Sequence, residues 1–264
     1  MQDTALPAKR RAELVRHVRE RGHATVAELA ELFAVSMDTI RRDLDHLAER
    51  QLIARTHGGA MHKDELATAD TPFDSRAAAH HQAKQAIGIA AARLISNGET
   101  LIVNGGTTTL AVVRALTGKR DLTVVTNNLR LPPEIPQEAV RDLYVIGGSC
   151  RISSNVTIGP VTFADTQGIS ADTAVIGVGG ISASGGLSTS NLQEAQMMRQ
   201  MIDAGTRVVV VADASKFGRS AFVHICGLDR VSVLVTDAPP PEDLAVALKD
   251  AEVELVTVGG APTL

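Results

Sequence analysis

The stretch LIVNGGTTTLAVVRAL, residues 101–116, indicates the class of the larger part of this chain. It opens with a continuous apolar run, which is typical of a strand that is covered on both faces. Two glycines then allow a tight turn, and after Thr107 the apolar residues return at helical spacing. Because a buried strand that turns directly into a helix is half of a β-α-β unit, this stretch predicts a parallel sheet.

Six further apolar runs alternate with helical stretches: residues 122–127, 143–148, 173–180, 207–213, 231–237 and 253–258. Intervening helices imply right-handed crossovers between parallel strands. Many of the runs end in Asn, Gly or Asp, and the carboxyl ends of the strands form the ligand crevice of such sheets. We therefore predict a Rossmann-like parallel-sheet α/β domain over residues 76–264, with a binding crevice at one edge of the sheet.

Residues 1–62 have a different texture, made of short amphipathic segments. Thr25 and Glu28 fit a capping box, and Ser36 fits the N-cap of a further helix after a bend. Residues 52–61 have the pattern of a short hairpin with glycines at its turn. Helix, helix, bend, helix and hairpin is the layout of a winged helix-turn-helix domain.

The polar residues 63–75 are predicted to link the two domains. The 264 residues carry a formal net charge of −4, and the first 60 hold 10 Lys and Arg against 9 Asp and Glu. Because that balance is nearly neutral, bulk charge does not indicate a nucleic-acid partner. Two cysteines without metal-ligand spacing, no apolar run of membrane length and no secretion signal predict a cytoplasmic protein without a bound metal.

The third predicted helix is the candidate for DNA contact. Its apolar residues recur at helical spacing: Ile40, Leu44 and Leu47. With these inside, Arg42 points outward and Arg41 lies on the flank. Arginine in the major groove can pair with phosphate or read guanine. On an isolated helix two such arginines are more often solvated and paired with Asp38 or Asp45, but the neighbouring caps, bend and hairpin favour DNA contact.

Residues 104–109, NGGTTT, are the candidate for binding an anion. Glycines allow close approach, free N–H groups at a helix start favour negative charge, and hydroxyls can donate. The spacing fits neither a dinucleotide fingerprint nor a Walker A loop, and an ordinary capped turn explains it equally well by itself. Lys216 and Arg219 could add positive charge for a sugar phosphate, and Asp213 could accept from a sugar hydroxyl. The predicted ligand-binding residues are Asn104, Gly105, Gly106, Thr107, Thr108, Thr109, Asn127, Gly148, Arg151, Gly179, Glu194, Asp213 and Lys216.

The chain resembles one protein family over nearly its whole length. Residues 25–60, TVAELAELFAVSMDTIRRDLDHLAERQLIARTHGGA, resemble the signature of DeoR-type bacterial transcriptional regulators. The motifs GTTT, VVTNNL, VGGI and DASKFG resemble the sensor domain of that family, whose fold is related to ribose-5-phosphate isomerases and CoA-transferases. The resemblance implies that double-stranded operator DNA is approached by Ser36, Thr39, Arg41 and Arg42 and, from the wing, by Arg55 and His57.

The same resemblance implies that the effector is a phosphorylated sugar or polyol. The family pattern usually has an acidic residue where this chain has Asn104, so a carboxylate that isomerase-like enzymes use is absent at that position. The segment 185–202 also departs from the pattern, and we expect Asn191 and Glu194 within it to lie at the mouth of the site.

Three functions compete on these observations. The favoured one is a homo-oligomeric repressor, a dimer or tetramer, of a carbohydrate or polyol catabolic operon, relieved by its effector and without cofactor or enzymatic activity. The second is an isomerase-like sugar-phosphate enzyme with a vestigial DNA-binding module, for which Asp213, Glu194 or Asp172 would be the general base. The third is an activator or scaffold whose α/β domain binds nothing small and only oligomerises.

Overall fold

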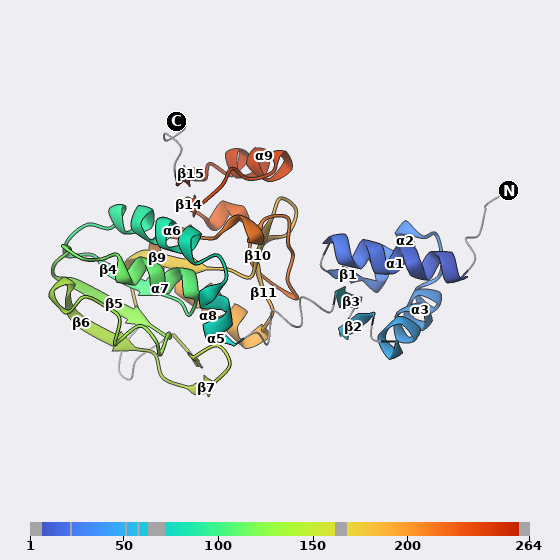
Figure 1. Cartoon of the computed structure of the whole chain (residues 1–264), viewed down its shortest axis with the longest axis horizontal. Coiled ribbons are helices and arrows are strands. Elements are labelled where there is room, and N and C mark those ends of the chain that lie inside the picture. The colour runs from blue at the N-terminus through green and yellow to red at the C-terminus, as the bar shows by residue number, and fades with distance from the viewer. Residues whose placement is uncertain are drawn as a thin grey trace.

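The structure is a computed structural model that describes residues 7–21, 23–50, 52–56, 59–62, 72–161 and 168–258 (Figure 1). The described residues form two units, each with its own buried apolar core. The N-terminal unit ends with β3 (Gly59–His62), and the C-terminal unit begins with α5 (Phe73–Ala78). Because α5 begins inside the range predicted as linker, ordered structure starts earlier than expected; the exact domain boundaries stay a prediction.

The N-terminal unit is a winged helix-turn-helix. It contains α1 (Pro7–Arg21), β1 (His23–Thr25), α2 (Val26–Leu32), α3 (Met37–Glu49), β2 (Ile53–Thr56) and β3. The predicted capping box is present, since the Thr25 side chain accepts from the Glu28 N–H and Glu28 accepts from the Thr25 N–H. The predicted hairpin is β2 paired antiparallel with β3, and β1 adds a third strand that the sequence pattern did not indicate.

The buried face of α3 carries the three predicted apolar residues and one unexpected carboxylate. Asp43 is buried, and its two oxygens accept hydrogen bonds from Arg10 Nε at 2.6 Å and Arg11 Nε at 2.7 Å. Burial alone would raise the pKa of Asp43, but the hydrogen bonds from the two guanidinium groups lower it below its ordinary value. A charge-assisted pair therefore fixes α1 on α3.

The C-terminal unit is built on a seven-stranded sheet in which every neighbouring pair is parallel, as predicted. Its strands are β4 (Thr100–Val103), β5 (Leu122–Thr126), β6 (Val140–Val145), β9 (Ala171–Gly177), β12 (Gly205–Val211), β14 (Val233–Thr236) and β15 (Glu254–Thr257). The spatial order is β15-β14-β12-β9-β4-β5-β6, so the direction of winding reverses between β4 and β9. Such a reversal opens a crevice beyond the carboxyl ends of the two strands.

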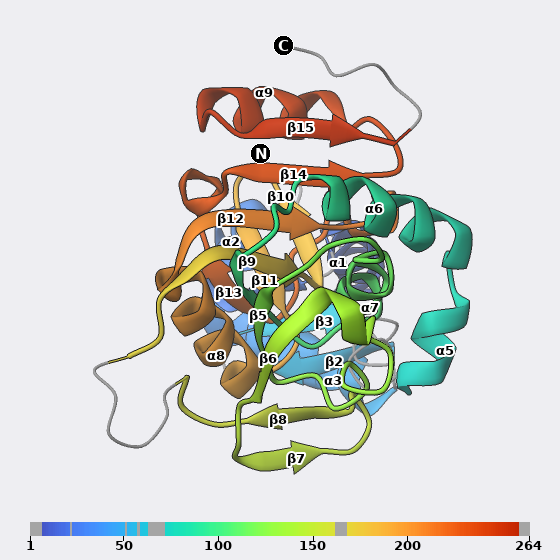
Figure 2. The ribbon, with the colours of Figure 1, turned by 90° about the vertical axis from the view of Figure 1, so that its left-hand side faces the viewer.

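Both faces of the sheet are covered, which explains the continuous apolar runs (Figure 2). One core combines the sheet with α6 (His81–Arg93) and α7 (Thr107–Arg114). The other combines the opposite face with α8 (Leu192–Ala204), including its three methionines, and α9 (Glu242–Asp250). Ile102 faces the second core while its neighbours Leu101 and Val103 face the first, as strand alternation requires.

Two small antiparallel elements were not predicted. β7 (Ser149–Arg151) pairs with β8 (Val156–Ile158), and β10 (Gly180–Ser182), β11 (Gly186–Thr189) and β13 (Val223–Cys226) form a three-stranded sheet. Only a 3-10 turn, Gln137–Ala139, lies between β5 and β6, so a helical crossover is absent there. The remaining 3-10 turns are Ala214–Lys216 and Leu228–Arg230.

Candidate nucleic-acid interface and effector cavity

The start of α3 is an exposed, capped helix end. Ser36 is its N-cap, with Oγ accepting from the Thr39 N–H at 3.2 Å and lying 2.9 Å from Thr39 Oγ1. An N-terminal helix end of this kind is what helix-turn-helix proteins insert toward base edges. Both hydroxyls satisfy each other and the helix end in the unbound chain, so contact with DNA would have to share or replace these bonds.

Arg41 and Arg42 are both exposed but differ in their partners. Arg41 Nη1 donates to Asp38 Oδ1 at 2.8 Å, whereas the Arg42 side chain has no hydrogen bond or ion pair with another described residue. The burial of Ile40, Leu44 and Leu47 confirms the predicted phase of the helix. The other two predicted DNA contacts are not tested, because His57 and the Arg55 side chain lie outside the described residues.

A cavity of about 350 Å³ lies where the winding of the sheet reverses. Its walls come from the loop after β4, the start of α7, the loop after β9 and the turn after β12, with further residues from α5, α6 and α8. These segments are far apart along the chain but meet at the carboxyl edge of the sheet. The position is the one that parallel-sheet topology predicts for a ligand site.

Asparagine side chains hold the glycine loop after β4 in place. Asn104 Nδ2 donates to the Gly177 carbonyl at 2.8 Å, and the Gly177 N–H donates to Asn104 Oδ1 at 2.8 Å. Asn127 Oδ1 accepts from the Gly105 N–H at 2.7 Å. A Cβ at Gly105 would lie 2.0 Å from Val156 Cγ1, so a larger residue would force Val156 or the loop to shift. The glycine is therefore required by packing against β8 and not by an unusual backbone angle.

The start of α7 opens into the cavity. Thr107 and Thr108 line it, and the N-cap Gly106 has no side chain that could occupy the first N–H groups of the helix. Thr109 turns inward, where its hydroxyl donates to the Asn104 carbonyl at 2.8 Å. Unoccupied N–H groups at a helix start favour a bound anion.

Basic side chains outnumber acidic ones around the cavity: Arg76, Lys84, Lys216 and Arg219 against Glu194 and Asp213. Lys84 is buried, and its Nζ donates to the carbonyls of Arg76 at 2.5 Å and Ala79 at 2.7 Å. Burial lowers the pKa of Lys84; nearby Asp213 opposes this, while Lys216 and Arg76 add to it. The Arg76 Nε is buried without a hydrogen-bond partner among the described residues. A bound anion would offset this excess of positive charge.

Nine of the predicted ligand-binding residues line the cavity: Asn104, Gly105, Gly106, Thr107, Thr108, Gly179, Glu194, Asp213 and Lys216. Four are not among the lining residues: Thr109, Asn127, Gly148 and Arg151. Thr109 and Asn127 are buried and brace the glycine loop. Gly148 has φ +133 and packs against Ile158, and Arg151 Nε lies 3.7 Å from Glu194 Oε1. Their geometry supports an indirect role in holding loops and orienting a carboxylate.

The basic side chains from α5 and α6 were missed by the sequence reading. Arg76 directly follows the predicted linker, and no local motif around His80 or Lys84 indicates a ligand site. His80 is the N-cap of α6 and has a left-handed backbone, φ 53. One signal was available: Lys84 falls on the buried face together with Ile87 and Ala91, and a lysine in such a position needs a partner.

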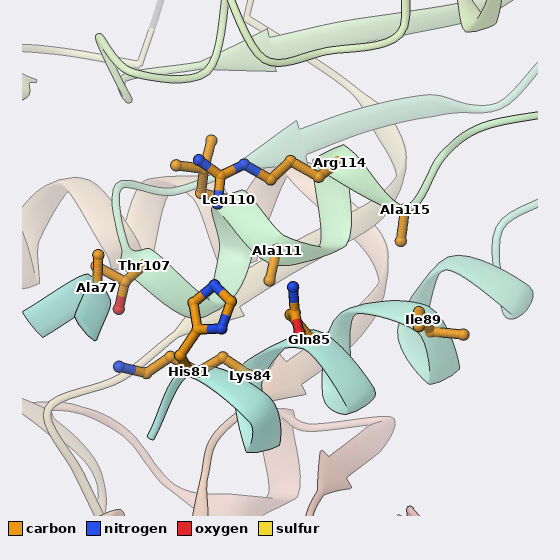
Figure 3. Close-up of a pocket in the computed structure, with 10 residues that line it drawn as sticks. All are labelled: Ala77, His81, Lys84, Gln85, Ile89, Thr107, Leu110, Ala111, Arg114 and Ala115. Carbon is orange, nitrogen blue, oxygen red and sulfur yellow. The ribbon is translucent and has the colours of Figure 1, made fainter. Parts of the chain in front are cut away.

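A second, adjacent cavity of about 300 Å³ lies between α6 and α7 (Figure 3). His81, Gln85 and Ile89 from α6 face Leu110, Ala111 and Arg114 from α7 across it. It shares Lys84 and Thr107 with the first cavity. Arg114, which lines it together with Lys84 and His81, is already paired with Glu134 through two hydrogen bonds. Its lining is therefore mainly apolar and less suited to an anion than that of the first cavity.

Comparison with known proteins accounts for both units. Residues 10–65 match the DeoR-like helix-turn-helix domain, and residues 79–238 match the DeoR C-terminal sensor domain. The chain belongs to the DeoR family. This DeoR-family protein is 35% identical over 242 residues to the glycerol-3-phosphate regulon repressor of Escherichia coli K12, covering 92% of this chain and 95% of that one. It is 34% identical over 247 residues to the transcriptional repressor CsqR of the same organism, covering 94% of each.

Two motifs, SKFGRSAFV at residues 215–223 and TDAPPP at 236–241, resemble those of glycerol-3-phosphate regulon repressors, and the first of these relatives is such a repressor. Among solved structures, ribose-5-phosphate isomerase A from Neisseria gonorrhoeae matches with a TM-score of 0.37 and 13% identity, covering 52% of this chain and 53% of that one. The relation of the sensor domain to isomerase and CoA-transferase folds stays a prediction. No described helix is both long and apolar enough to cross a bilayer.

The geometry of the DeoR-family sensor unit argues against the isomerase alternative. Asn104 is committed to the backbone of Gly177 and has no carboxylate. Asp172 does not line the cavity, and its carboxylate accepts from the Thr100 N–H at the amino ends of the strands. Glu194 and Asp213 remain at the cavity, but both already have partners: Asp213 accepts from the N–H and hydroxyl of Ser215, and Glu194 Oε1 accepts from Ser154 Oγ and lies 3.7 Å from Arg151 Nε. The curated relatives reported above are named as regulators and not as enzymes.

Proposed function

We propose that this DeoR-family protein is a cytoplasmic repressor of a carbohydrate or polyol catabolic operon, and that a phosphorylated sugar or polyol in the sensor cavity releases it from its operator. One observation carries the proposal. The uncapped N-terminus of α7 and an excess of basic side chains line the same cavity, at the point where the strand order of the sheet reverses. The repressor sense comes from the two Escherichia coli relatives, whose names describe them as repressors.

Different parts of the cavity suit different parts of such an effector. The phosphate would lie at the start of α7, close to Thr107, Lys84 and Lys216, where N–H groups, hydroxyls and cations converge. Glu194, which accepts from Ser154 Oγ at 3.3 Å, and Asp213 are acceptors for sugar or polyol hydroxyls. A ligand that is both anionic and rich in hydroxyls matches this lining better than a hydrophobic one.

The position of α5 supports a link between the cavity and DNA binding. It is the first described element after the residues that join the two units, and it contributes Arg76 to the cavity. Phe73 anchors it, with its ring buried and its N–H donating to the Ser153 carbonyl at 3.0 Å. An effector that binds Arg76 and Lys84 would change the free energy of this junction, which is the requirement for shifting operator affinity.

The test is a panel of glycerol 3-phosphate, fructose phosphates and related compounds, measured by thermal shift on the full chain. We expect one compound to raise the melting temperature and to lower affinity for an operator selected from random DNA. The Lys216→Ala variant should lose the shift, while Lys249→Ala, which removes an exposed lysine on α9, should keep it. No shift from any compound, with operator binding intact, would favour the scaffold alternative.

A further inference from the structure

Asp38 is an exposed carboxylate on the surface of the helix that faces DNA in the proposed function. It is the second residue of α3 and pairs with Arg41 at 2.8 Å, with side chains 75% and 53% exposed, respectively. So exposed a pair contributes little to helix stability. A carboxylate in this place also repels DNA phosphates, which weakens binding to any sequence. A carboxylate at position 38 therefore suggests a function whose benefit exceeds the cost of this repulsion.

The pair changes where the guanidinium of Arg41 lies. In helical phase Asp38 is opposite the buried residues Ile40 and Leu44, while Arg41 starts on the flank. Bonding to Asp38 draws the head of Arg41 toward the outward face and toward the N-terminal end of α3. That end is the part of a recognition helix that contacts base edges. In a complex with DNA, the flanking arginine would thereby be directed toward the groove.

Arg42 lacks such a brace. It has no partner among the described residues, so its long side chain keeps its rotameric freedom. An arginine with a mobile side chain can bind a phosphate on either side of the groove. An arginine that recognises a base must instead present two N–H groups in a fixed plane. Donation of one N–H to Asp38 leaves Arg41 four others for the O6 and N7 acceptors of guanine.

We propose that Asp38 is a positioning residue that holds Arg41 for the reading of a guanine in each half of the operator, while Arg42 binds phosphate. This assignment rests on the proposed DNA-binding function and adds to it the base that is read and the residue that orients the reader. Removing the charge of Asp38 should have two effects on affinity. Less repulsion of phosphate raises the affinity for any DNA, whereas the loss of Arg41 positioning lowers the affinity for the operator alone.

The test begins with an operator selected from random DNA by the full wild-type chain. Dissociation constants for that operator and for a random duplex are then measured at one salt concentration for the wild type, Asp38→Asn and Glu49→Gln. Glu49 is an exposed carboxylate on the same outward face of α3, so its replacement is a matched control for charge. Asp38→Asn should bind random DNA as well as the wild type or better, yet lose about fivefold or more in operator preference.

A second measurement identifies the base. Guanines of the operator are replaced one at a time by 7-deazaguanine, which lacks the N7 acceptor. The wild type should lose affinity at one position in each half-site, and both Arg41→Ala and Asp38→Asn should be much less sensitive there. The double variant should discriminate no worse than Arg41→Ala alone, because Asp38 acts through Arg41.

The inference is wrong if Asp38→Asn keeps wild-type operator preference, as Glu49→Gln should. It is also wrong if the double variant loses as much operator preference as the two single variants together. A wild-type chain that selects no sequence at all contradicts the proposed function instead. Circular dichroism melting of Asp38→Asn separates either result from misfolding, and since the side chain is exposed we expect the melting curve to stay close to that of the wild type.

Discussion

The side-chain amide of Asn104 links the carboxyl ends of β4 and β9 beside the cavity. It is buried, and it both donates to and accepts from the backbone of Gly177 at 2.8 Å. An ionised carboxylate accepts hydrogen bonds only, so an aspartate could satisfy the Gly177 N–H but not its carbonyl. The asparagine therefore determines how closely the two strands meet at the cavity, in addition to removing a candidate catalytic acid.

Replacing Asn104 by Asp should destabilise the C-terminal unit. The new carboxylate would be buried against the Gly177 carbonyl, at a cost of about 2–4 kcal/mol. The measurement is the melting temperature by circular dichroism, compared with Asn97→Asp. Asn97 only accepts, from the Arg120 N–H at 3.0 Å, so aspartate can replace it without losing that bond. Equal melting temperatures for the two variants would contradict the role given to the amide.

At the scale of the element, α3 is determined largely by local signals. Ser36 caps it, and the apolar spacing sets its buried face. Asp43 lies on that buried face and looks like a surface residue in the sequence, because its partners Arg10 and Arg11 are on another helix more than 30 positions away. Local pattern thus predicts the direction of the helix faces, and long-range packing decides which charges are buried.

The outward face of α3 predicts a distinct effect for Arg42→Ala. As an unbraced arginine that binds phosphate, Arg42 should contribute to all DNA sequences alike. We expect affinities for operator and random duplex to fall by similar factors, and the slope of log K against log salt to decrease by about one. Filter binding or fluorescence anisotropy over a range of salt concentrations checks both. A larger loss on the operator than on random DNA would instead make Arg42 a base reader.

At the scale of the whole molecule, the sheet order creates the cavity. β4 and β9 are adjacent in the sheet although some 70 positions separate them, and the loops after both strands line the same space. Arg76 and Lys84 reach it from α5 and α6, which precede the first strand of the sheet. Neither the adjacency nor these two basic residues follows from any local stretch of the chain.

The full protein should be a homo-oligomer in solution. One recognition helix per chain gives limited specificity, and closed symmetry would present two or more helices to repeated half-sites. Sedimentation should therefore give a mass that is a multiple of 27.8 kDa, and a footprint on the selected operator should show repeated half-sites about one helical turn apart or a multiple of it. A monomer at micromolar concentration that protects a single site would contradict this.

The sequence by itself determined the two fold classes, all seven strands of the parallel sheet, the caps of α2 and α3 and most of the loops that line the cavity. Those features depend on hydrophobic period and turn chemistry, which are local. Only the tertiary structure decided that Thr109 and Asn127 brace the loop, that Arg76 and Lys84 supply charge, and that Arg41 is held by Asp38 while Arg42 is not. These depend on side-chain direction and on contacts between distant segments, which sequence spacing does not specify.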